Sequence, residues 1–272
     1  MYIIPSFFTS LNIAAGYYAL SQVLLASATD FHHFDNAAKA IGLAIVADGF
    51  DGRIARMTNT TSEFGRELDS LADVIAFGVA PAVLAWVWGF RLLSETLYGD
   101  LRLWLVQIGA VVTFLFLTAG ASRLARFNIQ KNPQPCNPGR PDRKYFVGMP
   151  IPAGAAVVAA VVHFFHGRPL VIWWEACIWI VFVALVAFLM VSTWRFYSGK
   201  ELDLRSRRSF RLIVLICALL GLAWFFSGTV FVIVTLLYMF SGIFARLVYA
   251  FRRRTPPPAG VPPYQEVPQA HD

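Results

Sequence analysis

The feature that most constrains this chain is a series of apolar stretches, each long enough to cross a lipid bilayer, which takes about 20 helical residues. Eight such stretches occur in 272 residues. Only 14% of the residues are charged, whereas soluble domains carry about a quarter. We therefore expect an all-α, polytopic membrane helix bundle, with about eight spans near residues 6–27, 37–57, 70–90, 102–122, 148–165, 170–193, 209–227 and 229–250.

The composition also excludes several classes of protein. A hydrophobic content of 57% does not fit an ordinary soluble enzyme or a disordered chain. The net charge is +7, but no basic run is interleaved with aromatic residues, so we expect no nucleic-acid partner. One membrane domain over residues 1–254, surrounded by membrane lipids, and a disordered Pro-rich cytoplasmic tail over residues 255–272 are predicted.

The distribution of Lys and Arg predicts the orientation of the bundle. With the N-terminus in the cytoplasm, only Lys39, Arg91, Arg102 and Arg168 fall on the far side, and the other 19 of 23 basic residues fall on the cytoplasmic side. Basic residues concentrate in cytoplasmic loops of membrane proteins. The chain is therefore expected to be a multi-pass protein of the cell membrane, with both termini in the cytoplasm.

Charged residues inside spans are costly and mark functional sites by default. Four of the ten aspartates occur between positions 48 and 73. Asp48 and Asp51 share one face of the second expected span, and Asp69 and Asp73 share one face of the third. Both pairs lie near the cytoplasmic ends of their helices, on either side of a short turn. We expect the two pairs to face each other, with the site at the cytoplasmic surface.

Four ionised carboxylates at close quarters repel one another unless cations bind between them. Oxygen ligands suit Mg²⁺, Mn²⁺ or Ca²⁺ rather than zinc. Gly52 and Ala55 leave a shallow groove beside the carboxylates, and Arg56 adds a fixed cation suited to a phosphate oxygen. These residues together predict a pyrophosphate site with bound metal. The alternative is that an Asp–Arg pair merely stabilises the bundle, but this explains a single pair better than the whole set.

The same residues match a known pattern. Asp48-x2-Asp51-Gly52-x2-Ala55-Arg56-x8-Gly65-x3-Asp69-x3-Asp73 resembles the signature of the CDP-alcohol phosphotransferase family, at every fixed position. The resemblance implies a six-helix core that binds a CDP-linked alcohol and two divalent ions at the cytoplasmic face. It implies Mg²⁺ or Mn²⁺ as cofactor, with Ca²⁺ as an alternative at one position, and a homodimer.

The resemblance also implies roles for single residues. Asp48, Asp51, Asp69 and Asp73 would bind the metals, with Asp73 also the catalytic base. The CDP-alcohol would be bound by Asp48, Asp51, Gly52, Ala55, Arg56, Ser62, Gly65 and Asp69. An acceptor hydroxyl would then attack the β-phosphate, and CMP would leave.

Three further stretches indicate the acceptor. The opening from Pro5 to Asn12, the run Arg123-Leu-Ala-Arg126-Phe-Asn128, and the segment from Lys144 to Ala153 resemble the phosphatidylserine synthases of this family. The resemblance therefore implies CDP-diacylglycerol and L-serine as substrates. A planar guanidinium can clamp the carboxylate of serine through two parallel hydrogen bonds. Arg123, Arg126 and Asn128 are the candidate serine-binding residues, unless the two arginines only set the topology.

Two alternatives stay open at this point. Another member of the family would use glycerol 3-phosphate or inositol phosphate as acceptor, and would need a denser basic pocket beside the aspartates. A cation transporter would also carry paired intramembrane aspartates. Transporters place them near the middle of the bilayer, often in inverted repeats, and this chain has no second copy of the motif.

Overall fold

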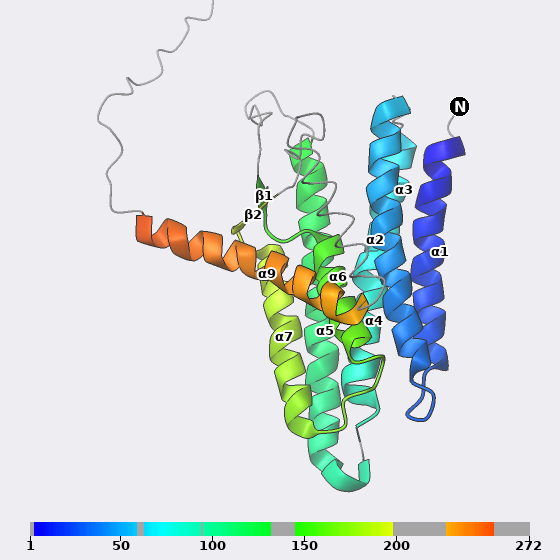
Figure 1. Cartoon of the computed structure of the whole chain (residues 1–272), viewed down its shortest axis with the longest axis vertical. Helices are drawn as coiled ribbons and strands as arrows, with labels where there is room; N and C mark the ends of the chain where they lie inside the picture. The colour runs from blue at the N-terminus through cyan, green and yellow to red at the C-terminus, as the bar shows by residue number, and fades with distance from the viewer. Residues whose placement is uncertain (1–2, 59–62, 94, 132–144, 198–226, 253–272) are drawn as a thin grey trace, which may run out of the picture.

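The computed structural model describes residues 3–58, 63–93, 95–131, 145–197 and 227–252. Within these residues the chain is a helix bundle (Figure 1). Two π-helical segments, η1 (Val74–Val79) and η2 (Val87–Arg91), continue helices α3 and α4. The α-helices are α1 (Ile3–Leu25), α2 (His32–Thr58), α3 (Glu63–Asp73), α4 (Ala80–Trp86), α5 (Glu95–Lys131), α6 (Ile151–Phe164), α7 (Trp173–Val191) and α9 (Ser227–Arg252). The expected all-α bundle is confirmed.

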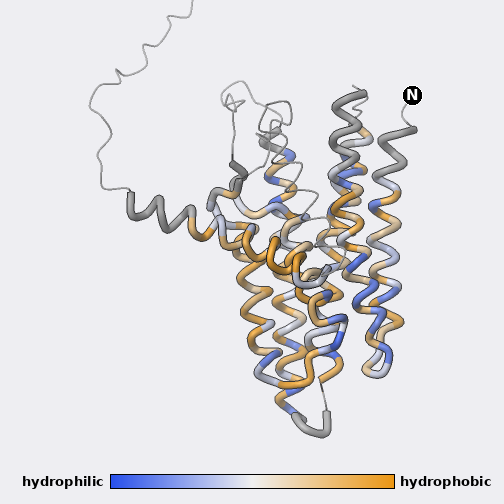
Figure 2. The backbone as a smooth tube through the Cα atoms, viewed as in Figure 1, coloured by the Kyte–Doolittle hydropathy of each residue, from blue (hydrophilic) through white to orange (hydrophobic). Residues whose placement is uncertain are grey.

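Long apolar helices make the chain an integral membrane protein. Within the described residues, four are long and apolar enough to cross a bilayer: Glu67–Arg91, Gly99–Asn128, Trp173–Val191 and Ser227–Phe244. The apolar helix α6 is shorter. Seven of the eight expected spans coincide with helices, and nearly all of the stretch 209–227 lies outside the described residues. Figure 2 shows that α7 and α9 are mostly hydrophobic, whereas the turn between α1 and α2 is hydrophilic.

The third span is one continuous helix whose winding changes three times, from α to π, back to α, and to π again. Helix α3 ends at Asp73, and the π-helical segment η1 begins at the next residue. Helix α1 packs closely against this segment, because a Cβ on Gly16 would lie 3.0 Å from the Cα of Ala76. Small residues at such contacts let membrane helices approach each other closely. This contact fixes the position of α1 relative to the end of α3.

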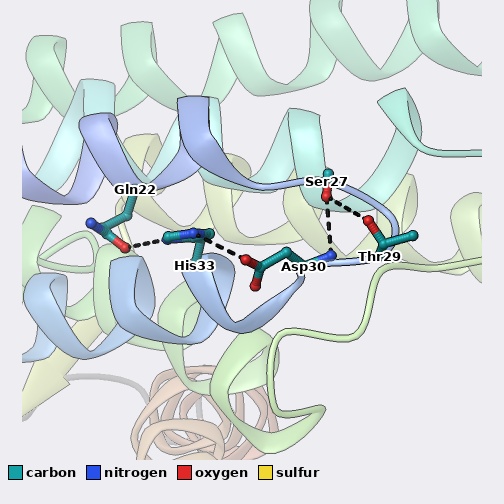
Figure 3. A network of polar contacts seen from close by, with 5 residues as sticks. All are labelled: Gln22, Ser27, Thr29, Asp30 and His33. Atoms are coloured by element: carbon teal, nitrogen blue, oxygen red, sulfur yellow. Dashed lines mark hydrogen bonds and ion pairs between the residues drawn. The ribbon is translucent and has the colours of Figure 1, made fainter.

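The turn between α1 and α2 is held by a chain of polar contacts (Figure 3). His33 Nδ1 lies 2.7 Å from Gln22 Oε1, and His33 Nε2 lies 3.5 Å from Asp30 Oδ2. The Asp30 backbone N–H donates to Ser27 Oγ at 3.0 Å, and the Ser27 and Thr29 hydroxyls are 3.2 Å apart. The turn is thereby closed by side chains, and it brings α1 and α2 together as an antiparallel pair.

A small antiparallel pair of strands is a feature that the sequence analysis did not predict. Strands β1 (Tyr145–Val147) and β2 (Arg195–Tyr197) are antiparallel, with Phe146 opposite Phe196. Gly148, at a φ of +77°, follows β1 directly. A Cβ there would lie 2.5 Å from the carbonyl oxygen of Met190, so only glycine fits. This turn ties the start of α6 to the end of α7.

Candidate active site

Three of the four motif aspartates converge at one point of the bundle. Asp48 lies on α2, and Asp69 and Asp73 lie on α3. One carboxylate oxygen from each of the three lies within 4.8 Å of the others. Asp73 is buried, with 9% of its surface exposed, whereas Asp48 and Asp69 are half-buried. Carboxylates from two helices therefore meet in one small volume, as the spacing of the motif predicts.

The local winding of the chain explains how α3 presents two carboxylates. Asp69 and Asp73 are one turn apart, so their side chains leave the same face of the helix. Directly after Asp73 the helix changes from α to π winding. Single π-helical turns occur frequently at functional sites, because they change the direction of neighbouring side chains. Sequence periodicity contains no signal for this change of winding.

Asn12 is a member of the site to which the sequence analysis gave no role. It lies on α1, is only 1% exposed, and donates from Nδ2 to Asp73 Oδ1 at 3.4 Å. Among the described residues, no hydrogen-bond partner reaches its other polar atom, Oδ1. A buried amide oxygen without a partner is costly. The signal was present in the sequence, since Asn12 closes the opening stretch that resembles the family.

Arg123 reaches the same cluster from α5. Its guanidinium is partly buried and interacts electrostatically with the Asp73 carboxylate. It also lies 5.7 Å from the centre of the Phe127 ring, which is cation–π distance. Arg126, one turn further along, is exposed. Of the two candidate arginines, the structure brings Arg123 to the aspartates.

Asn128 contacts α3 beside Asp69. Its Nδ2 donates to the Ser70 hydroxyl at 2.8 Å, and Ser70 directly follows Asp69. Helix α5 extends to Lys131, nine residues beyond the expected span, so Arg123, Arg126 and Asn128 all lie on a helix rather than in a loop. Ser70 is a second site neighbour that the sequence analysis missed, and no signal in the sequence marks it.

The remaining motif residues fall partly outside what the structure describes. Gly65 is half-buried on α3. Ser62 lies outside the described residues. The backbone of α2 includes the other four, but their side chains are not among those described: Asp51, Gly52, Ala55 and Arg56.

The donor set of the cluster fits a hard divalent cation. Carboxylate oxygens from Asp48, Asp69 and Asp73 lie close enough to bind one ion. The unpartnered Oδ1 of Asn12, on the residue that contacts Asp73, adds a neutral oxygen to the same neighbourhood. Mg²⁺, Mn²⁺ and Ca²⁺ prefer such all-oxygen surroundings. No histidine or cysteine belongs to this group among the described residues, so it does not resemble a zinc site.

The structure is thus an integral membrane helix bundle with an acidic cluster between α2 and α3. The model of the CDP-alcohol phosphatidyltransferase family matches residues 2–194 of this chain. The chain belongs to this family, which depends on divalent metals.

Curated relatives are similar over much of the chain. A CDP-diacylglycerol–serine O-phosphatidyltransferase from Helicobacter pylori is 35% identical over 231 residues, which cover 82% of this chain and 82% of the relative. Proteins with the same name from Mycobacterium leprae and Methanocaldococcus jannaschii are 37% and 38% identical. Those two matches cover 65% and 57% of this chain, and 53% and 58% of the relatives.

Proposed function

We propose that this chain transfers the phosphatidyl group of CDP-diacylglycerol to the hydroxyl of L-serine, releasing CMP and forming phosphatidylserine. The observation that carries the proposal is the convergence of Asp48, Asp69 and Asp73, beside Arg123, in a chain of this family. The relatives that share this specific name support serine as the acceptor.

The donor half of the site is assigned to the motif. Asp48, Asp51, Asp69 and Asp73 are proposed to hold two Mg²⁺ or Mn²⁺ ions, with Ca²⁺ as an alternative at one of them. Such ions neutralise charge on a pyrophosphate and orient it for in-line displacement. Close to the aspartates, the cytidine diphosphate is proposed to contact Gly52, Ala55, Arg56, Ser62 and Gly65.

Asp73 is proposed as the general base. Its carboxylate takes the proton of the serine hydroxyl as the serine oxygen attacks the β-phosphate, which carries the lipid. The bond between that phosphorus and the oxygen leading to CMP breaks, and CMP departs with the electron pair. Burial limits the access of bulk water to Asp73, and the Asn12 amide restricts how its carboxylate turns. Both effects favour transfer to a bound alcohol over hydrolysis.

The acceptor half of the site is assigned to α5. Arg123 is proposed to clamp the serine carboxylate, because it combines a guanidinium with a position next to Asp73. A serine held in this way presents its hydroxyl to the base. Asn128 is proposed to support this side through its contact with Ser70. Arg126 is exposed, and we propose a weaker role for it, in attracting anionic substrates or lipid.

The alternatives differ in what they require. Glycerol 3-phosphate and inositol phosphate carry a phosphate dianion, and a site for them needs several cations beside the cluster. Among the described side chains, Arg123 is the cation that interacts electrostatically with Asp73. The cation-transporter alternative does not explain why the chain belongs to a family of transferases. We also propose that the site and both termini face the cytoplasm. The homodimer that the resemblance implies stays a prediction.

The proposed function is tested by CMP release from CDP-diacylglycerol. Purified protein in detergent, supplied with Mg²⁺ or Mn²⁺, is assayed with L-serine, with glycerol 3-phosphate, with inositol phosphate and without acceptor. The proposal predicts rapid release with serine alone. Faster release with a phosphorylated acceptor would identify that acceptor, rather than serine, as the substrate. Equal release without acceptor would indicate a hydrolase.

A further inference from the structure

Helix α9 lies beyond residues 2–194, the part of the chain that matches the family model. Figure 1 shows it running across the direction of the other helices, from the end of α6 toward the strands β1 and β2. It packs against α6 and β2. Two sets of contacts, one at each end of this path, indicate what the helix does.

The start of α9 is joined to α6 and α2 by a chain of hydrogen bonds. Ser227 Oγ lies 2.9 Å from His163 Nε2, and His163 Nδ1 lies 2.5 Å from Asp35 Oδ1. The second oxygen of Asp35 pairs with Lys39 Nζ at 2.7 Å. His163 is only 7% exposed. With both of its ring nitrogens partnered, this buried histidine joins three helices.

This chain of contacts lies far from the cluster of Asp48, Asp69 and Asp73. Asp35 and Asp48 are 13 residues apart on α2, which corresponds to about 20 Å along a helix. The backbones of α6 and α9 also meet here, since a Cβ on Gly228 would lie 3.2 Å from the Cα of Phe164. The start of α9 is therefore fixed at the end of the bundle opposite the aspartates.

Eleven residues further along, α9 reaches strand β2. Tyr238 is partly buried, and its ring centre lies 5.8 Å from that of Phe196 on β2. Phe196 is fully buried. Its ring also fills the space beside Gly242, where a Cβ would lie 2.3 Å from a ring carbon. The packing of Phe196 against α9 sets the position of Tyr238.

The phenol of Tyr238 interacts electrostatically with the guanidinium of Arg123, the residue that also interacts with Asp73. A guanidinium has five N–H groups in one plane and must be correctly oriented to grip a carboxylate with two of them. Tyr238 on α9 thus gives the guanidinium a second interaction besides the one with Asp73 on α3, and two partners on different helices limit how it can rotate.

We propose that Tyr238 is a positioning residue for the acceptor: it orients Arg123 toward the serine carboxylate, and the Ser227–His163–Asp35 contacts fix the helix that carries it. This inference rests on the proposed function. It assigns to α9, outside the family-matched segment, a part in selecting the acceptor rather than in binding the donor.

The first test compares Tyr238→Phe and Tyr238→Ala with Leu237→Ala. Leu237 is the neighbouring residue on α9 and is 66% exposed, so its truncation controls for altered lipid contact. We expect both Tyr238 variants to raise the KM for serine about three- to tenfold, the usual effect of losing one polar contact. The KM for CDP-diacylglycerol should stay within about twofold, and Leu237→Ala should leave both unchanged.

The possible results separate this inference from the proposed function. If the wild-type protein transfers nothing to serine, the proposed function fails. If the wild-type protein is active with serine and Tyr238→Phe has an unchanged KM for serine, the role of Tyr238 is overturned. An equal rise in the KM for CDP-diacylglycerol and in the KM for serine would also contradict a role specific to the acceptor.

The second test addresses the anchor of α9. Ser227→Ala removes the hydroxyl that contacts His163. Thr229→Ala, which removes an exposed hydroxyl from the same turn, is the control. Ser227→Ala should raise the KM for serine in the same direction as Tyr238→Phe, whereas Ser227→Thr, which keeps the hydroxyl, should restore it. A Ser227→Ala variant that melts earlier but keeps the wild-type KM for serine would reduce the anchor to a purely stabilising contact.

Discussion

Asn12 on the first helix donates a hydrogen bond to Asp73 on the third, with 3.4 Å between Nδ2 and Oδ1. Both side chains are buried, at 1% and 9% exposure. The proposed base is therefore held from a helix 61 residues away in sequence. The close contact of Gly16 with Ala76, one turn further along each helix, keeps these two helices in register.

Asn12→Ala should lower kcat while leaving the KM for both substrates within about twofold. Its loss frees the Asp73 carboxylate to turn, and a hydrogen bond to a charged group contributes about 1.5–3 kcal/mol, or roughly ten- to a hundredfold in rate. Steady-state kinetics of purified variants measure this. Ser21→Ala, on the same helix with its hydroxyl bonded to the Tyr18 carbonyl, is the matched control. Equal losses in both variants would contradict the role of Asn12.

Asp48→Asn and Asp69→Asn should each abolish turnover and weaken metal binding. A neutral amide replaces one of the carboxylates that meet within 4.8 Å. Binding of Mn²⁺ to the purified protein, followed by electron paramagnetic resonance in the absence of substrates, gives a readout independent of activity. Near-normal Mn²⁺ affinity and turnover at saturating metal would remove the altered residue from the ligand set.

Asp73→Asn separates chemistry from donor binding. The variant should keep its affinity for CDP-diacylglycerol within a few fold, because the other motif aspartates remain. Its kcat should fall by about 10²–10⁴, the usual contribution of a general base. Donor binding is measured by calorimetry and turnover by CMP release. A collapse of donor affinity as complete as in Asp48→Asn would make Asp73 mainly a metal ligand.

Arg123→Ala and Arg126→Ala form a matched pair, one turn apart on α5. Arg123→Ala should raise the KM for serine about ten- to a hundredfold, the size of a lost charge-assisted contact. Arg123→Lys should recover only part, because an ammonium lacks the planar fork. Arg126 is exposed, so Arg126→Ala should have a much smaller effect. Serine saturation curves of the purified variants measure these changes in KM. A larger rise for Arg126→Ala than for Arg123→Ala would assign binding of the acceptor carboxylate to Arg126.

Gly148→Ala should destabilise the protein. The φ of +77° costs about 1–2 kcal/mol for a residue with a Cβ, and the clash with the Met190 carbonyl adds to it. A lower thermal unfolding midpoint in detergent measures the effect. Gly42→Ala on α2 is the control, because its Cβ would meet only one atom, at 4.0 Å. A midpoint that Gly148→Ala leaves unchanged would contradict the described turn.

Sequence patterns predicted the helices better than the contacts between them. Apolar length located the third span, but the change to π winding after Asp73 depends on packing against α1 and leaves no periodic signal. The strands β1 and β2 pair residues about 50 positions apart, in segments that read as polar loops.

Residue type alone also could not show which of the two arginines lies at the site. Arg123 and Arg126 are neighbours on one helix surface, and only the packing of α5 against η1, which directly follows Asp73, shows which one lies by Asp73. Tyr238 had no sequence signal, because its role depends on where α9 crosses the bundle.

The most direct test of the central claim follows isotope-labelled L-serine into lipid. Purified wild-type protein and Asp69→Asn are incubated side by side with CDP-diacylglycerol and Mg²⁺ or Mn²⁺, and lipid and nucleotide products are quantified by mass spectrometry. The account predicts labelled phosphatidylserine and CMP in equal amounts from the wild-type protein, and neither from Asp69→Asn or after removal of the metal. CMP without labelled lipid, or label incorporated equally by Asp69→Asn, would contradict it.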